Sequence, residues 1–168
     1  WTYDYLTAEQ IRTIADTVWS KSLQYAYNLS KTGKNLGGML NWSATCNHNW
    51  NLVCNGGFGT AALGFMNDLD NEKATKCAVM IPQQINDSQI ALSELHQNGS
   101  WPESVDYSQY SFLHFTKFIA ALVETVGDDY KYLDYAPLKK NAKFNMYLTG
   151  AKMCFNFHDC GPNFPNML

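Results

Sequence analysis

The sequence predicts an all-α protein whose helices form antiparallel hairpins. Apolar residues recur at helical spacing in several long segments, and residues that commonly cap helices stand at the ends of those segments. No comparable run of strand-like alternation precedes Gly150. The 168 residues are enough for one compact domain. We therefore expect a single helical domain over residues 1–168.

The first helix is the most clearly marked one. The segment Thr7-Ala8-Glu9-Gln10 matches a capping box, in which Thr7 caps the helix and Gln10 reaches back to it. Apolar residues follow with a period of about 3.6 as far as Tyr27, so the helix is expected to end near Ser30. Residues 31–49 are rich in Gly, Asn, Thr and Ser, which predicts a long loop.

Four further helices are predicted. The segment 52–68 is apolar and rich in glycine, which suits a helix that packs closely on a neighbour or faces a ligand. A helix over 71–96 contains Pro82, where a kink is expected. Gly127 marks the end of a helix over 107–126, and Pro137 opens one that reaches 148. Alternating residues at 153–157 predict a short strand near the C-terminus.

Composition argues against several classes of partner. The net charge is −3 and Arg12 is the only arginine, so the chain offers no cationic stripe for the phosphates of a nucleic acid. No run of about 18 apolar residues occurs, so no membrane-spanning helix is expected. The cysteines and histidines lack a paired Cys-x-x-Cys spacing, and we therefore predict neither a metal nor another cofactor.

The aromatic content suggests two kinds of contact. Aromatic residues make up 14% of the chain and charged residues only 16%. Rings with a polar edge suit the flat faces of sugars, and they equally suit a large core with apolar interfaces. Apolar helix faces left exposed would favour a homo-oligomer.

Polar amides cluster in the segment 47–57, just ahead of the glycine-rich helix. Asn side chains both donate and accept hydrogen bonds, which suits sugar hydroxyls and carboxylates. The N-terminus of a helix adds partial positive charge that favours an anionic group. The alternative is a purely structural one, in which these amides cap the helix and bond within the loop.

Three blocks resemble the heparinase II/III-like proteins. The stretch 49–57 reads Asn-Trp-Asn-Leu-Val-Cys-Asn-Gly-Gly and resembles their Asn-Trp-Asn-x-Val-Cys-Asn-x-Gly stretch. Trp101-Pro102-Glu103 followed by Tyr107-Ser108-Gln109-Tyr110 resembles their Tyr-Pro-Glu-Gly and Tyr-x-x-Tyr helix. The stretch 135–161 resembles a segment that ends in a Phe-Asn-Tyr-x-Asp-Cys-like turn. Together the blocks cover residues 40–161.

The resemblance implies a central slice of an incomplete (α/α) toroid, without the β-sandwich domain that normally follows it. It also implies export, to the bacterial periplasm or the outside of the cell. Family members that are lyases cleave uronic-acid-containing polysaccharides by β-elimination. That reaction needs a neutralised uronate carboxylate, a base for the C5 proton and an acid for the leaving oxygen.

Carried over by position, Asn49 matches the residue that neutralises the carboxylate, and Tyr107 matches the tyrosine that can act as base and acid. Trp50 stands where a histidine commonly follows the asparagine, while His48 precedes it. The catalytic candidates are therefore Asn49, Tyr107, His48 and, one turn further on, Tyr110. We expect the acidic polysaccharide to contact Trp50, Asn51, Trp101 and His114.

Two other functions remain open from the sequence. The chain would be a non-catalytic carbohydrate-binding toroid if the aromatic residues only stack on sugars. It would be a self-associating fragment without activity if its bare helix faces drive assembly. Glu103 and Asp106 also give a minor alternative, the paired carboxylates of a glycoside hydrolase.

Overall fold

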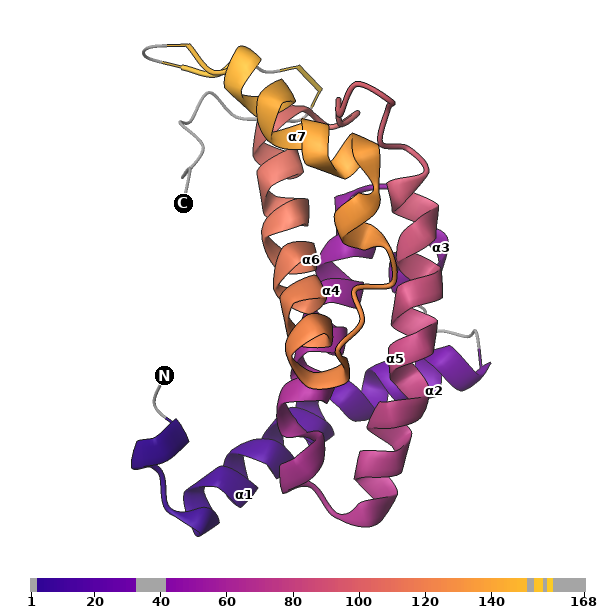
Figure 1. Cartoon of the computed structure of the whole chain (residues 1–168). Helices are drawn as coiled ribbons and strands as arrows, with labels where there is room; N and C mark the ends of the chain where they lie inside the picture. Colours follow the sequence, from indigo (N-terminus) through magenta and orange to yellow (C-terminus); the bar gives the residue numbers. More distant parts are fainter. Residues whose placement is uncertain (1–2, 33–41, 151–152, 156, 159–168) are drawn as a thin grey trace.

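A computed structural model describes residues 3–32, 42–150, 153–155 and 157–158. The described part is all-helical, which confirms the predicted fold class (Figure 1). No helix in it is both long and apolar enough to cross a membrane. The prediction that these helices are part of an incomplete (α/α) toroid stays a prediction. The principal helices are α1 (Ala8–Val18), α2 (Gln24–Thr32), α3 (Trp42–Thr45), α4 (Asn49–Phe65), α5 (Asn71–Leu92), α6 (Ser104–Val126) and α7 (Ala136–Tyr147).

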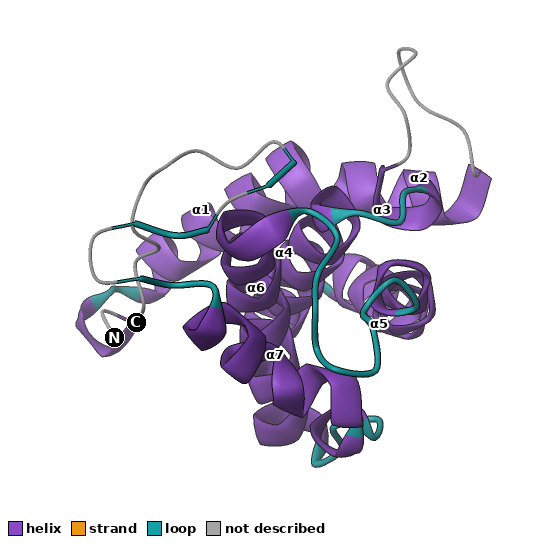
Figure 2. Ribbon diagram, turned by 90° about the horizontal axis from the view of Figure 1, so that it is seen from above, coloured by secondary structure: helices purple, strands orange, loops and turns teal. Residues whose placement is uncertain are grey.

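The three longest helices, α4, α5 and α6, stand side by side and enclose the core (Figure 1). A short 3-10 turn, Met66–Asp68, joins α4 to α5 in an antiparallel hairpin. Helix α6 runs parallel to α4, because Asn49 contacts Glu103 at one end and Gly59 contacts Phe118 further along. Seen from above, α6 lies between α4 and α7 (Figure 2). Most buried apolar side chains of α4, α5 and α6 form one cluster, and Leu138 and Phe144 of α7 pack against it.

Two glycines allow α4 to approach α6 closely. A Cβ on Gly56 would lie 2.7 Å from the backbone oxygen of His114, and one on Gly59 would lie 2.3 Å from the Phe118 ring. Gly57 and Gly64 lie on the other side of α4 and have no such neighbour within 4 Å. The prediction that the glycines serve close packing is thus confirmed at Gly56 and Gly59.

The N-terminal helix crosses one end of the three long helices (Figure 1). The capping box is present, since Thr7 accepts from the Gln10 backbone and the Gln10 side chain accepts from Thr7. Between α1 and α2 the chain continues through a π-helical turn, Trp19–Leu23, without leaving the helix. Trp19 and Leu23 of this turn are buried in the core. Their packing holds α1 and α2 against the long helices.

Several predicted boundaries of helices, and the predicted strand near the C-terminus, differ from the structure. Helix α4 begins at Asn49, so the amide-rich motif lies inside its first turns and not in a preceding loop. The short helix α3 interrupts the predicted loop 31–49, of which residues 33–41 lie outside the described part. Pro82 is accommodated inside α5, which ends at Leu92. In the described part of 153–157 there is no strand, only an isolated bridge between Thr149 and Cys154.

Candidate functional site

The start of α4 is held by a carboxylate from the loop before α6. Glu103 accepts a hydrogen bond from the Asn49 backbone N–H at 2.6 Å and another from Asn49 Nδ2 at 2.6 Å. The capping residue itself, His48, makes no side-chain bond to the helix end. A carboxylate at this position satisfies free N–H groups and interacts favourably with the positive end of the helix dipole. Glu103 therefore works as a helix cap supplied by a distant segment.

Trp101 belongs to the same arrangement and is not a sugar platform. Its indole Nε1 donates to Glu103 Oε2 at 3.1 Å, and its ring packs edge-on against Phe112 with centroids 5.4 Å apart. Only 1% of Trp101 is exposed, so no sugar can stack on it. The predicted ligand contact is corrected to a core position that also orients Glu103.

The amides of the motif are used inside the fold. Asn51 Nδ2 donates to the backbone oxygens of Ser43 and Asp87, at 2.8 and 3.0 Å, and Asn55 Nδ2 donates to Ser43 O at 2.8 Å. Both side chains are completely buried. They tie α3 and α5 to α4, because buried backbone carbonyls need such partners. Asn51 is therefore a structural residue in this fold and cannot contact a polysaccharide as predicted.

Asn49 does not present the chemistry that the resemblance implies. Its Nδ2 group faces Glu103, and the only free amide atom is Oδ1, a buried oxygen without a hydrogen-bond partner among the described residues. An oxygen acceptor beside a carboxylate repels an anionic group. In this conformation Asn49 cannot neutralise a uronate carboxylate.

The three blocks that carry the family resemblance meet at this end of the helices. Glu103 and Asn49 join the first two blocks, as described above. The third block joins the second through Asn141, which bonds to Ser108 Oγ at 2.9 Å and to the Gly99 carbonyl oxygen at 2.9 Å. The Phe157 backbone N–H also donates to Ser104 Oγ, at 3.3 Å. Blocks far apart in sequence thus form one connected hydrogen-bonded region.

A second group of predicted residues lies along one face of α6. Tyr107, Tyr110 and His114 recur at helical spacing, and Lys117 continues the same stripe one turn further on. Tyr107 and His114 are half-buried, Tyr110 is 40% exposed and Lys117 is exposed. The rings of Tyr110 and His114 meet edge-on with centroids 5.3 Å apart. We call Tyr107, Tyr110, His114 and Lys117 the α6 stripe.

Electrostatics within the α6 stripe favour a neutral imidazole. Partial burial lowers the pKa of His114 below its usual value, and the positive charge of Lys117 lowers it further. A neutral imidazole can accept a proton or a hydrogen bond at pH 7. Lys117 adds the cation that an acidic ligand needs. Sequence reasoning missed Lys117, although its spacing from His114 was a usable signal.

The remaining predicted residues lie at the start of α4. His48 is half-buried, whereas Trp50 is 41% exposed on the outer face of the helix. The Asn49 side chain points toward Glu103, whereas the Trp50 side chain points toward solvent. Neighbouring residues of the motif therefore lie on different faces of α4, one packed inside the fold and one exposed. Trp50 is therefore the one motif residue whose ring is available at the surface.

The four cysteines in the described residues form no disulfide with one another. Burial raises the pKa of Cys54 to about 11, with a smaller contribution from Cys46, and burial raises the pKa of Cys77 to about 11 as well. Cys46 and Cys154 are the other cysteines in the described part of the chain, while Cys160 lies outside it. Within the described ranges no three His, Cys, Asp or Glu residues gather closely enough to hold a metal ion.

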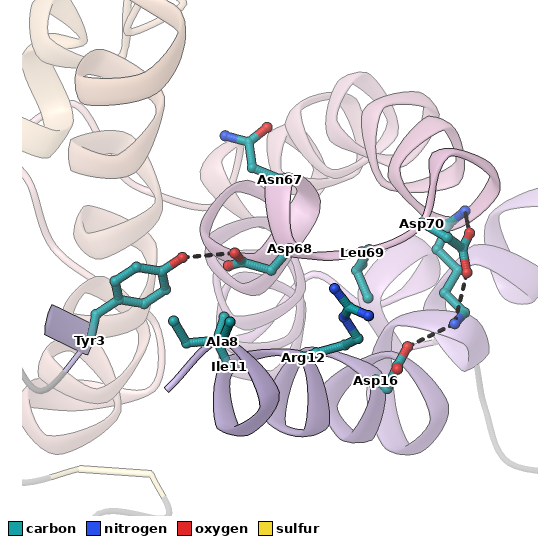
Figure 3. A pocket seen from close by; sticks show the side chains of 10 residues that line it. Tyr3, Ala8, Ile11, Arg12, Asp16, Asn67, Asp68, Leu69 and Asp70 are labelled. Carbon is teal, nitrogen blue, oxygen red and sulfur yellow. Dashed lines mark hydrogen bonds and ion pairs between the residues drawn. The ribbon is translucent and has the colours of Figure 1, made fainter. Parts of the chain in front are cut away.

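A cavity of about 510 Å³ lies elsewhere, between α1 and the turn that leads into α5 (Figure 3). Lys73 pairs with Asp16 at 2.7 Å and with Asp70 at 2.9 Å. The Tyr3 hydroxyl donates to Asp68 at 2.7 Å. The lining contains three carboxylates against two cations, Arg12 and Lys73, so it does not favour an acidic ligand. These contacts fix α1 on the α4–α5 hairpin.

Comparison of the chain with protein-family models, with curated proteins and with solved structures found no significant match.

Proposed function

We propose that this chain is part of a heparinase II/III-like helical domain that binds an acidic polysaccharide along the α6 stripe. On this proposal the chain does not complete β-elimination by itself. The proposal rests on the three resembling blocks and on one observation, the contact of the Tyr110 and His114 rings next to Lys117. A ligand on this stripe would meet aromatic edges, hydroxyls and a cation within about three helical turns.

The chemistry of the stripe fits a uronate better than a neutral sugar. An exposed ammonium attracts a carboxylate, and Tyr hydroxyls exchange hydrogen bonds with sugar hydroxyls. Tyr110 offers a partly exposed ring on which a sugar face can lie. Lys117 is the one cation among the four residues of the stripe, so it is the group that selects for charge.

The same geometry argues against complete catalysis. Elimination needs the carboxylate neutralised so that the C5 proton becomes acidic. Asn49, which would do this by resemblance, is bonded to the Glu103 carboxylate and buried to all but 4%. A neutral His114 could accept a proton, but Lys117 alone supplies positive charge on the stripe. Binding is therefore the function that the contacts support best.

Calorimetric titration with a galacturonate tetrasaccharide tests the proposal, with a neutral glucose tetrasaccharide as the matched ligand. We expect the acidic sugar to bind at least about tenfold more tightly than the neutral one, since one charge-assisted contact separates them. Equal affinities, or no binding of either ligand, would contradict the proposal. Ultraviolet absorbance of the same mixtures would detect unsaturated uronate, and we expect none to accumulate.

A further inference from the structure

A second cavity of about 600 Å³ lies between the turn after α5 and the outer face of α7. The turn contributes His96, Gln97 and Asn98, and α7 contributes two lysines and two aromatic residues. This cavity contains none of the residues that the sequence analysis assigned to the site. It is large enough for a small organic ligand, which typically occupies cavities of about 300–1,000 Å³.

The two walls of the cavity are fixed against each other. A Cβ on Gly99, whose φ is +89°, would lie 2.5 Å from the Lys140 carbonyl carbon, so the turn packs directly on the backbone of α7. Asn141 Nδ2 donates to the Gly99 carbonyl oxygen at 2.9 Å. Lys140 Nζ donates to the Gln97 carbonyl oxygen at 3.0 Å. The cavity is therefore formed before any ligand enters, which lowers the entropic cost of binding.

Charge in this cavity has one sign. Lys140 and Lys143 both line it, and no Asp or Glu is among the described residues that do so. Lys140 uses one of its three donors on Gln97, and Lys143 lies over the Tyr147 ring at 5.9 Å from the centroid. No carboxylate among the residues that the structure describes pairs with either lysine. The unbalanced positive charge favours an anion.

The rest of the lining is largely apolar. Phe144 and Leu148 form part of the wall, and Tyr147 is 75% exposed beside them. A flat ligand can lie against the Tyr147 ring while its charged end reaches the lysines. Asn98 and Gln97 add amide groups at the edge of the cavity. A fully polar anion such as free phosphate would leave the apolar wall unused.

We propose that this cavity binds a small monoanion that carries its carboxylate on a ring. Lys140 and Lys143 bind the carboxylate, and Tyr147 with Phe144 contacts the face of the ring. An aromatic acid and a sugar acid share this chemistry. The site is separate from the α6 stripe, and the inference does not depend on the function proposed for the stripe.

Benzoate and glucuronate, each paired with a neutral analogue, test this site by calorimetry on the whole chain at low salt. Benzyl alcohol and methyl glucoside are the analogues. We expect at least one anion to bind about tenfold or more tightly than its analogue. Binding of benzoate alone identifies an aromatic acid, and binding of glucuronate alone identifies a sugar acid. Failure of both anions, or equal binding of the analogues, would overturn the proposal.

Substitutions locate the binding. The double variant K140M/K143M should weaken the anion about tenfold or more, and Tyr147→Ala should also weaken it. Lys139→Met and Tyr130→Ala are matched controls, because Lys139 pairs with Asp134 and neither residue lines the cavity. If loss of the Lys140–Gln97 bond unfolds the double variant, Lys143→Met alone provides the test. Anion affinity that is unchanged in Lys143→Met and Tyr147→Ala would place the site elsewhere and overturn the proposal.

Discussion

Glu103 accepts hydrogen bonds from both the backbone N–H and the side-chain amide of Asn49, each at 2.6 Å. One carboxylate thereby caps α4 and joins it to the loop before α6. The same contact occupies the amide that the family resemblance assigns to substrate. The Asn49 amide cannot both bond to Glu103, as the fold requires, and neutralise a substrate carboxylate, as the predicted catalysis requires.

Replacing Glu103 by Gln should destabilise the protein by about 2 kcal/mol, because charge-assisted hydrogen bonds are lost at a helix end. The new amide would also place a donor against Asn49 Nδ2. Urea denaturation followed by circular dichroism measures the change. Glu94→Gln is the control, since Glu94 is exposed and accepts one bond, from Asn47 Nδ2, and it should change stability by less than about 0.5 kcal/mol. Equal effects would refute the capping role.

Gly56 and Gly57 are neighbours that should respond to alanine in opposite directions. Gly56→Ala should destabilise by about 2 kcal/mol, because its Cβ would lie 2.7 Å from the His114 backbone oxygen. Gly57→Ala should stabilise by about 0.5–1 kcal/mol, because the new methyl meets open space and alanine favours the helix. Thermal unfolding of both variants measures the difference. The same sign for both would contradict the close approach of α4 to α6 at Gly56.

The raised pKa values of Cys54 and Cys77 predict slow alkylation. At pH 9 a thiol whose pKa is about 11 is about 1% ionised, against half for a thiol at the usual 9.0. Iodoacetamide should therefore modify both at least about 50-fold more slowly in the folded protein than in urea. Because the pKa of both thiols is higher in the folded state, their protonated form stabilises the fold. This contribution to the free energy of unfolding is fully present below pH 9 and is lost as the pH rises toward 11. Equal alkylation rates in the folded and unfolded protein would exclude the raised pKa values.

The positive charge of Lys117 should affect the titration of His114. Lys117→Met removes a positive charge that lowers the His114 pKa, so that pKa should rise toward its usual value while the effect of burial remains. An NMR titration of the imidazole signals measures the shift. Lys131→Met is the control, because Lys131 belongs to the turn between α6 and α7 and is not a cause of the shift. No difference between the two variants would show that Lys117 does not reach His114.

The helices could be predicted because their signals are local. The Thr7–Gln10 capping box and Gly127, with a φ of +76°, lie where the sequence placed them. The start of α4 could not be predicted from local signals, since its cap is Glu103, 54 residues away. The sequence shows that Asn49, Asn51 and Trp101 can donate hydrogen bonds. It does not show that these donors already bond to partners inside the fold. Exposed aromatic residues on α6 were found because helical spacing reports which residues share a face.

Affinity of a galacturonate tetrasaccharide for Lys117→Met, compared with the Lys139→Met control, tests the central claim most directly. Both variants lose one exposed lysine, so nonspecific charge effects are matched. The α6 stripe predicts that Lys117→Met binds about tenfold more weakly than the original chain, while Lys139→Met binds as before. Equal affinities of the two variants would contradict acidic polysaccharide binding on the α6 stripe.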